Sequence, residues 1–217
     1  MTPVWTRLGL HGMRATRSDD TVLEGAFVPD DHIARVLPAA AAGMDLFVLG
    51  LFAWALVGFS NVYYAIGKRM LDLTLDYVPQ KTSLGLGGAS YGQHPGIQHG
   101  LAEMIMRCDA MEPHLDSVAE GYAASVLQAG SWGAADAPGW VSKIVGLKEI
   151  VTRDAFQVSN LAVEMVGGLG VARKGESERL LRDSRMGQIH PLNPQLTREL
   201  VAKIALGIDL DAQPRWA

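Results

Sequence analysis

The sequence predicts a mainly α-helical protein, an antiparallel up-and-down four-helix bundle preceded by a few short β-strands. Three observations lead to this fold class. Apolar residues recur at helical spacing over long stretches, prolines and glycines fall where such helices should end, and β-forming residues gather near the N-terminus. We expect the strands in residues 1–37 and the helical domain in residues 38–217.

One of the N-terminal strands is expected at residues 21–28. This segment, T-V-L-E-G-A-F-V, is short and rich in β-formers, and Pro29-Asp30-Asp31 ends it. Glycines, Ser18 and Asp19-Asp20 punctuate the chain before it, which indicates two or three short strands in all.

The first helix is predicted over residues 44–77, and Pro79 ends it because proline disfavours helix in the residue before it. No charged residue occurs from Leu46 to Gly67, a length close to the roughly 20 residues that span a bilayer. We interpret this run as a core helix that is apolar on all sides because it is packed on all sides. A single membrane span is the alternative.

The other three helices follow from spacing and capping. The second begins near Pro95 and carries an unbroken a/d seam, which consists of Ile97, Leu101, Met104, Cys108, Met111, Leu115, Val118 and Tyr122. The third spans roughly residues 141–166. The fourth starts at Asn193-Pro194, where asparagine suits the N-cap and proline suits the first helical position.

Composition and charge exclude several classes of protein. The formal net charge is −4 and no long basic run occurs, so we expect no nucleic-acid partner. Cys108 is the only cysteine, which leaves no disulfide framework and no cysteine-based zinc site, and fits a cytoplasmic location. The first ten residues lack the apolar core of a signal peptide.

Two segments are candidates for chemistry. Gly167, Gly168 and Gly170 follow the third helix, where glycines either cap a helix or let another group approach the backbone closely. They do not form a dinucleotide-binding fingerprint, because a helix rather than a strand precedes them. His190 lies in I-H-P-L-N-P, where it could act as a base near neutral pH or serve a structural role. The run from Glu178 to Asp183 is interpreted as a solvated helical face with i,i+4 ion pairs.

The order of these motifs resembles the C-terminal half of acyl-CoA dehydrogenases. The matching segments are G-M-R-A-T-R-S-D-D-T-V-L-E-G-A-F-V-P at residues 12–29, H-P-G-I-Q-H-G-L-A-E-M at residues 94–104, and A-V-E-M-V-G-G-L-G with E-R-L-L-R-D-S-R within residues 162–185. The resemblance implies the end of a middle β-domain followed by the C-terminal helical bundle of this flavoprotein family. The family's N-terminal helical domain and most of its β-domain are then outside this sequence.

The resemblance also implies FAD as cofactor. In this family FAD lies between the β-domain and the bundle, and the bundle also reaches the FAD of a neighbouring subunit through its glycine-rich turn. The family's arginine before a Lys-Thr-Phe-Gly turn is Gln80 here, so we expect one phosphate contact to be weakened or to move to Lys81. By this resemblance the cofactor-binding residues are Gly167, Gly168, Gly170, Asn193, Gln195 and Lys81.

Two departures from the family bear on the reaction. The common catalytic glutamate falls at Pro191, and the alternative glutamate of some members falls near Ala55, so neither position has a carboxylate. Acyl-CoA dehydrogenation needs a base for the α-proton while a hydride leaves the β-carbon for the flavin. His190 is therefore the replacement base that the sequence offers.

The resemblance leaves three functions open. The first is FAD-dependent CH–CH oxidation of an acyl thioester in fatty acid metabolism, by this chain or by an enzyme of which it is a truncated or partial subunit. The second is the chemistry of a flavin-dependent monooxygenase-like relative, which needs no α-proton base. The third is a non-catalytic role in assembly. We expect a homo-oligomer (dimer or tetramer), or a hetero-oligomer with a chain that supplies the missing domains, because flavin sites of the family straddle subunits.

Overall fold

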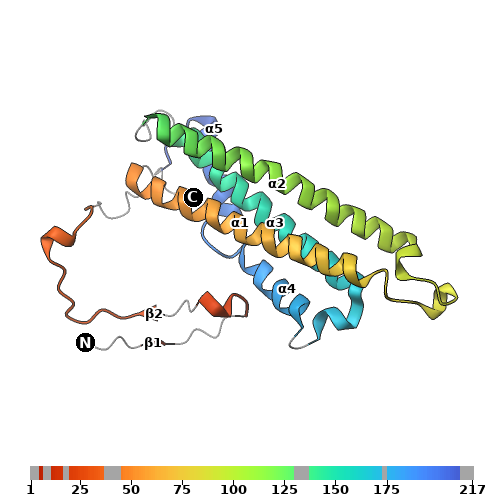
Figure 1. Ribbon diagram of the computed structural model, residues 1–217. Coiled ribbons are helices and arrows are strands. Elements are labelled where there is room, and N and C mark those ends of the chain that lie inside the picture. The colour runs from red at the N-terminus through yellow and green to blue at the C-terminus, as the bar shows by residue number, and fades with distance from the viewer. Residues whose placement is uncertain are drawn as a thin grey trace, which may run out of the picture.

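The computed structural model describes residues 5–6, 11–16, 20–36, 45–129, 137–172 and 175–210. The α-helices in these ranges are α1 (Leu46–Tyr77), α2 (Pro95–Ala129), α3 (Ala137–Val166), α4 (Glu176–Met186) and α5 (Pro194–Leu206). The long helices α1, α2 and α3 lie side by side, and the short α4 packs against α1 and α3 (Figure 1). The predicted helical bundle is confirmed.

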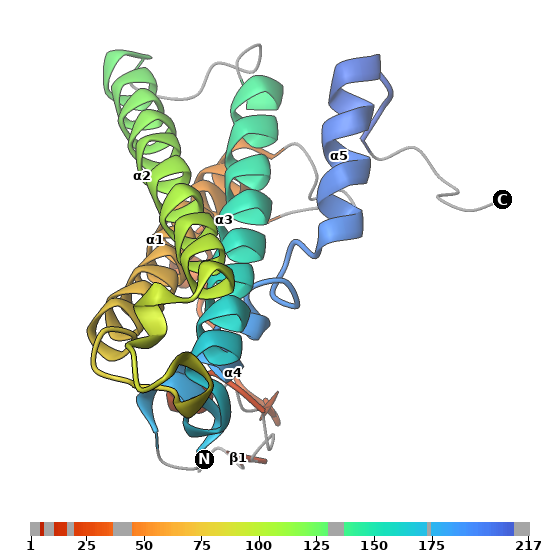
Figure 2. The ribbon, with the colours of Figure 1, turned by 90° about the vertical axis from the view of Figure 1, so that its right-hand side faces the viewer.

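The centre of the bundle is α3, which contacts each of the other four helices. It begins at Ala137, four residues before the predicted start. Figure 2 shows α5 standing beside α3, and the apolar face of α5 packs on the core through Leu200, Val201 and Ile204. The predicted start of α5 is confirmed, because the side chain of Asn193 accepts a hydrogen bond from the Leu196 N–H at 3.0 Å.

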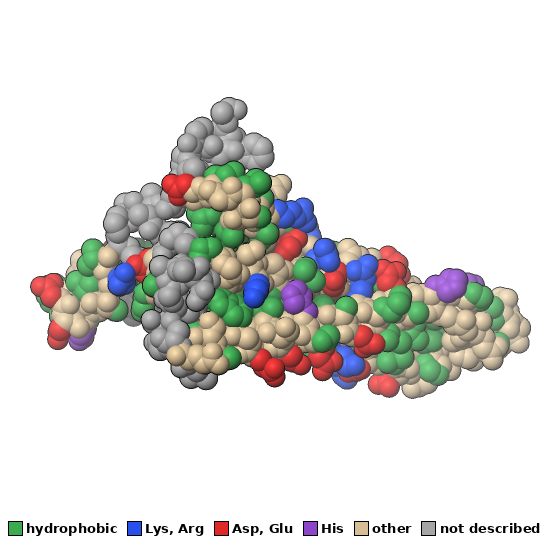
Figure 3. All heavy atoms as spheres, turned by 90° about the horizontal axis from the view of Figure 1, so that it is seen from above, with side chains coloured by type: hydrophobic (Ala, Val, Ile, Leu, Met, Phe, Trp, Pro, Cys, Tyr) green, Lys and Arg blue, Asp and Glu red, His purple; other side chains and the backbone are tan. Residues whose placement is uncertain are grey.

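The a/d seam of α2 is also confirmed. Ile97 and Leu101 are half-buried against the core, and the remaining six seam residues are fully buried, namely Met104, Cys108, Met111, Leu115, Val118 and Tyr122. A helix with this spacing keeps one stripe against its neighbours over its whole length, so α2 lies along both α1 and α3. On the face seen in Figure 3, acidic and basic side chains are interspersed with hydrophobic ones.

The packing of α1 differs from the prediction. Its buried residues, such as Ala53, face α2, α3 and α4. Its other face leaves Phe47, Leu51, Trp54 and Val62 exposed, with 54%, 62%, 62% and 47% of each residue accessible. The expectation of a helix packed on all sides is therefore wrong for the described chain, and the apolar composition reflects one buried face and one uncovered face. By length and composition α1 could cross a membrane, a test that bundle helices also pass.

The N-terminal segment contains less strand than expected. Strands β1 (Trp5–Thr6) and β2 (Asp20–Thr21) form an antiparallel ladder of two residues each. The strand predicted over residues 21–28 is limited to Thr21, and the segment that follows is exposed, with Phe27 86% accessible. Its β-formers have no apolar layer to cover among the described residues. The expected domain boundary at residues 37 and 38 lies outside the described ranges.

Contacts with α4 fix the start of this segment to the bundle. The Met13 N–H donates a hydrogen bond to the Asp183 carboxylate, and the Arg182 guanidinium donates to the His11 carbonyl at 2.7 Å. Arg182 also pairs with Glu178 one turn earlier. The predicted i,i+4 pairing on α4 is confirmed, and two of its charged residues hold a segment about 170 positions away.

Candidate functional site

The loop after α1 brings Lys81 and Tyr91 together. The Tyr91 N–H donates to the Lys81 carbonyl at 2.8 Å, and Thr82 and Ser90 form an antiparallel bridge between them. At the tip of the loop, Gly87 and Gly88 have φ values of 63° and 86°, a left-handed conformation that glycine adopts without strain. The loop therefore folds back on itself and presents two side chains from its base.

The ammonium group of Lys81 reaches the end of α3. Its Nζ lies 3.1 Å from the carbonyl oxygen of Val166, the last residue of α3, where a cation stabilises the unpaired carbonyls of a helix C-terminus. The same Nζ lies 4.3 Å from the ring centroid of Tyr91 and 5.3 Å from that of Tyr77. Desolvation opposes the charge, but the interactions with Tyr77 and Tyr91 outweigh it and raise the pKa of Lys81. The group is therefore a cation at neutral pH.

The three glycines after α3 differ in backbone conformation and in the space around them. They lie in a 3-10 helix, Gly167–Val171. Gly167 has φ 74° and ends α3, and a Cβ placed on it would be 3.8 Å from Lys81 Nζ. A Cβ on Gly170 would lie 3.2 Å from Val163 Cα, so close packing on α3 explains that glycine. Gly168 is exposed, its φ is not positive, and no described atom lies within 4 Å of where its Cβ would be.

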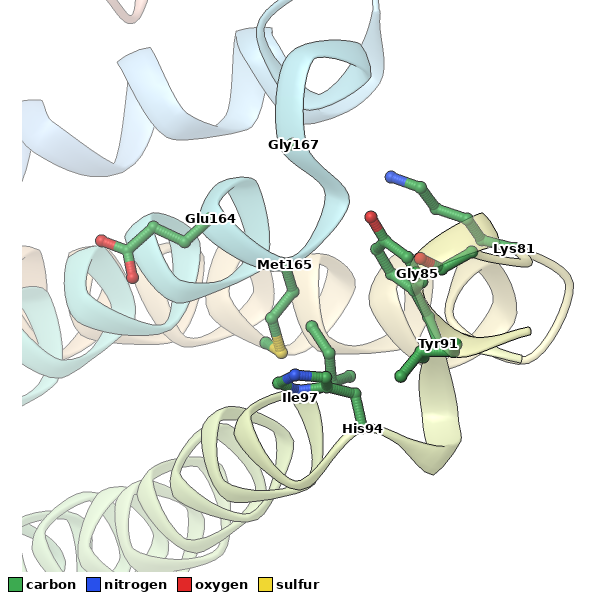
Figure 4. Close-up of a pocket in the computed structure, with 10 residues that line it drawn as sticks. Lys81, Gly85, Tyr91, His94, Ile97, Glu164, Met165 and Gly167 are labelled. Atoms are coloured by element: carbon green, nitrogen blue, oxygen red, sulfur yellow. The ribbon is translucent and has the colours of Figure 1, made fainter. Parts of the chain in front are cut away.

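A hollow of about 420 Å³ lies between the loop and the glycine turn (Figure 4). Its lining consists of Lys81, Ser83, Gly85, Leu86, Tyr91, His94, Ile97, Glu164, Met165 and Gly167. The structure thus brings together Lys81 and Gly167, two residues predicted to bind a cofactor and separated by 86 positions in the chain. Gly168 and Gly170 are not among the described lining residues.

Among the described lining residues, Lys81 is the only lysine or arginine. Glu164 accepts a hydrogen bond from Asn160 Nδ2 at 2.7 Å, and Figure 4 shows its carboxylate turned away from Lys81. His94 Nδ1 accepts from the Gly96 N–H at 3.1 Å at the start of α2, so a neutral ring carries its proton on Nε2. Gln80 donates to the Asp76 carbonyl at 2.8 Å and lies outside the described lining.

Sequence reasoning missed several residues of this hollow. Tyr91, His94 and Met165 were not singled out for binding, although His94 directly precedes Pro95 at a helix start, a position where side chains cap the backbone. Tyr91 had no signal of its own, because its position beside Lys81 depends on hydrogen bonds across the loop.

The candidate base His190 lies in a different place. Its ring packs edge-on against Phe59 of α1, with ring centroids 4.3 Å apart, and its Nδ1 lies 3.0 Å from the Pro191 carbonyl oxygen. Ala55 is one turn before Phe59 on α1. Of the two positions where the resemblance places a glutamate, Pro191 directly follows His190, and Ala55 lies one turn from the α1 residue that contacts the His190 ring. Among the described residues, no carboxylate hydrogen-bonds to the His190 ring.

The two regions are far apart. Lys148, which contacts the His190 carbonyl, and Val166, which contacts Lys81, are separated by about 27 Å along α3 at 1.5 Å per residue. Asn193 caps α5 near His190, and both Asn193 and Gln195 are exposed. The predicted cofactor residues therefore divide into one group at the glycine turn and one at the start of α5.

Comparison with known proteins identifies the family. Residues 52–206 match the acyl-CoA dehydrogenase C-terminal domain, so the chain belongs to the acyl-CoA dehydrogenase family. It is 25% identical over 201 residues to an acyl-CoA dehydrogenase of Bacillus subtilis, and 26% identical over 192 residues to the mitochondrial isovaleryl-CoA dehydrogenase of Solanum tuberosum. These alignments cover 93% and 88% of this chain but 47% and 42% of the relatives, so the chain spans about half the length of the curated relatives it matches.

A solved structure supports the fold. KijD3, in complex with FMN and dTDP-3-amino-2,3,6-trideoxy-4-keto-3-methyl-D-glucose, superposes with a TM-score of 0.84 at 19% identity. The match covers 97% of this chain and 50% of KijD3. At this identity the likeness concerns the fold.

Proposed function

We propose that the chain forms the helical part of a flavin-dependent oxidoreductase of acyl-CoA dehydrogenase type, which oxidises a CH–CH bond of an acyl thioester with FAD. The observation that carries the proposal is the hollow built by Lys81 and Gly167, because family membership alone does not indicate whether this chain retains a place for a nucleotide.

The residues of this hollow fit the dinucleotide end of FAD. Lys81 is a cation whose Nζ contacts the Val166 carbonyl, Tyr77 and Tyr91, so a phosphate oxygen would bind it by taking the place of a tyrosine hydroxyl. Tyr91 and Ile97 offer an aromatic and an apolar surface for a flat base. Next to the lining residue Gly167, the backbone at Gly168 is open, which suits close approach of a ligand. The hollow lies far from His190. This separation supports the proposal that the FAD bound at the glycine turn belongs to a neighbouring subunit.

At the other end of the bundle, His190 is the group proposed to accept a proton. Bound FAD would supply the acceptor for the hydride that leaves the β-carbon of the acyl thioester. The half-buried His190 ring, held between Phe59 and the Pro191 carbonyl, would take the α-proton. The apolar surface of Phe59 and Ala55 would line the space beside it.

A second candidate is a flavin monooxygenase-like activity. It is favoured by one observation: neither of the two positions where the resemblance places the family's base, Ala55 and Pro191, carries a carboxylate. A third candidate is a non-catalytic assembly subunit, which the exposed face of α1 suits. The same face supports an oligomer of this chain, or one with a chain that supplies the remaining domains. We propose a cytoplasmic location for all three.

The test is retention of flavin. Purified protein mixed with FAD is passed through gel filtration, and the visible absorbance of the protein peak is measured. We expect the protein to retain FAD, and ADP to compete for it because the hollow would hold the nucleotide end. If the protein stays colourless at every concentration, both alone and with a chain that supplies the remaining domains, the result would favour the assembly subunit.

A further inference from the structure

Lys148 is a lysine without any solvent exposure in the middle of α3. Its Nζ donates to the carbonyl oxygen of His190 at 2.8 Å and to that of Leu192 at 2.8 Å. These two carbonyls flank Pro191. Lys148 therefore binds the loop between α4 and α5 at the candidate base His190 and at Leu192, two residues further on.

The surroundings of Lys148 indicate that core stability alone does not explain it. Burying an ammonium group costs several kcal/mol, and an apolar side chain often replaces a buried charge without loss of stability. Among the described residues Lys148 forms no ion pair, because the adjacent Glu149 is bonded to Arg198 of α5 at 3.1 Å. Burial lowers the pKa of Lys148 to about 8, with Glu149 opposing the shift. Compared with an apolar side chain, lysine at this position adds the hydrogen bonds that fix two backbone carbonyls.

The loop is also held by other contacts, and the Ile189 and His190 N–H groups donate to the Met186 carbonyl at 3.0 and 2.9 Å. Its first residue, Gly187, is held by packing, since a Cβ there would lie 2.8 Å from Thr152 Cβ and 2.9 Å from Tyr63. Its last residue, Asn193, is held as the cap of α5. Between them, Lys148 binds the carbonyls on both sides of Pro191.

We propose that Lys148 is a positioning residue that fixes the loop of residues 187–193 and thereby sets the orientation of the His190 ring against Phe59. Its functional meaning depends on the proposed role of His190, whereas its geometry does not. An ammonium group with two carbonyl acceptors defines the path of the backbone on either side of Pro191, and the His190 side chain leaves that backbone at a fixed angle.

The experiment reads the position of His190 directly, without substrate or flavin. An aromatic ring 4.3 Å away shifts the NMR signals of the His190 ring, and His190→Gln identifies them among those of the six histidines. In Lys148→Met we expect these shifts to collapse toward those of an exposed histidine, and amide exchange within residues 187–193 to rise at least tenfold. Lys143→Met is the matched control, because Lys143 is exposed on the same helix.

Lys148→Arg retains a charged donor and should recover part of the His190 shift. If Lys148→Met does not fold, Lys148→Gln carries the test, since its shorter amide keeps a polar group but does not reach both carbonyls. Unchanged His190 signals and loop exchange in a folded variant would overturn the proposal. Equal changes at all histidines and along all of α3 would also overturn it, because they indicate a general role in the core. A later finding that His190 is not catalytic would leave the positioning result intact.

Discussion

The side chain of Lys81 donates a hydrogen bond to the carbonyl oxygen of Val166 at 3.1 Å, which joins the loop after α1 to the last residue of α3. The contact places a cation at a helix C-terminus beside the glycine turn. It therefore has two consequences, one for the ending of α3 and one for any anion that enters the hollow, and these can be separated by experiment.

Replacing Lys81 with Met should weaken FAD or ADP binding at least about tenfold, because a hydrogen bond to a charged group contributes roughly 1.5–3 kcal/mol. Isothermal titration at two salt concentrations measures the effect, and the wild type should lose affinity with salt more steeply. Lys143→Met is the control, since Lys143 lies over Trp140 at 4.6 Å, away from the hollow. Equal affinities for Lys81→Met and wild type would remove Lys81 from the site.

The neighbouring glycines allow a matched pair of substitutions. Gly167→Ala should lower the free energy of unfolding by roughly 1–2 kcal/mol, because φ 74° is costly for a residue with a Cβ. Gly168→Ala should leave stability nearly unchanged, since its Cβ meets open space, yet it should weaken nucleotide binding if the ligand contacts that backbone. Urea unfolding and ADP titration of both variants check this. Normal binding by Gly168→Ala would place the ligand elsewhere.

The sequence predicted the bundle well where periodicity or capping decides the structure. The seam of α2 and the start of α5 at Asn193 depend on residues three or four positions apart, which a sequence displays directly. Lys148 was not predicted, because its partners are 42 and 44 positions away and a lysine on a helix normally reaches solvent. The exposed face of α1 was misjudged for a related reason: apolar residues look the same whether or not another surface covers them.

The resemblance, rather than any local sequence pattern, predicted that Lys81 and Gly167 both bind the cofactor. Lys81 lies in the loop between α1 and α2, whose shape depends on a cross-loop hydrogen bond and two left-handed glycines rather than on a sequence period. For His190, the sequence motif indicated the candidate base but not the contacts that hold it. Lys148, which binds the His190 carbonyl, lies on a helix that the motif does not contain.

Substitution of His190 tests the proposed proton transfer. In the assembled enzyme, His190→Ala should lower turnover of an acyl thioester about 10²- to 10⁴-fold, the usual contribution of a general base, while FAD retention stays normal. Turnover is followed with an artificial electron acceptor. The control is Ile189→Ala, because Ile189 directly precedes His190 and is 58% exposed. Undiminished turnover would exclude His190 as the base and strengthen the monooxygenase-like alternative.

The buried lysine should make stability depend on pH in a defined direction. The pKa of Lys148 is about 8 in the folded chain against 10.5 when unperturbed, so between these values the unfolded state binds more protons and stability rises with pH. This contribution is complete above pH 10.5 and is lost as the pH falls through about 8. The difference in unfolding free energy between wild type and Lys148→Met should grow by up to about 1.4 kcal/mol per pH unit between pH 8 and 10. Urea unfolding across this range measures it, and a constant difference would contradict the assignment.

The uncovered face of α1 should control assembly. Phe47, Leu51 and Trp54 recur at spacings of four and three, so they form one stripe on the side away from the bundle. A contiguous apolar surface of this kind favours association between protein surfaces. We expect the wild type to remain in the supernatant after membranes are pelleted and to elute as an oligomer in size-exclusion chromatography with light scattering. Leu51→Glu should shift the mass toward the monomer with little change in melting temperature, because 62% of Leu51 is accessible in the single chain.

Met106→Glu provides the matched control for that substitution, since Met106 is 64% accessible on α2 and lies outside the α1 stripe. It introduces the same charge at a comparable exposure and should leave the mass unchanged. Equal dissociation by both variants would mean that added charge, rather than loss of the α1 surface, separates the subunits. Protein that pellets with membranes and resists salt extraction would instead assign the stripe to a bilayer, because a hydrophobic contact with lipid does not weaken as salt rises, whereas an electrostatic one does.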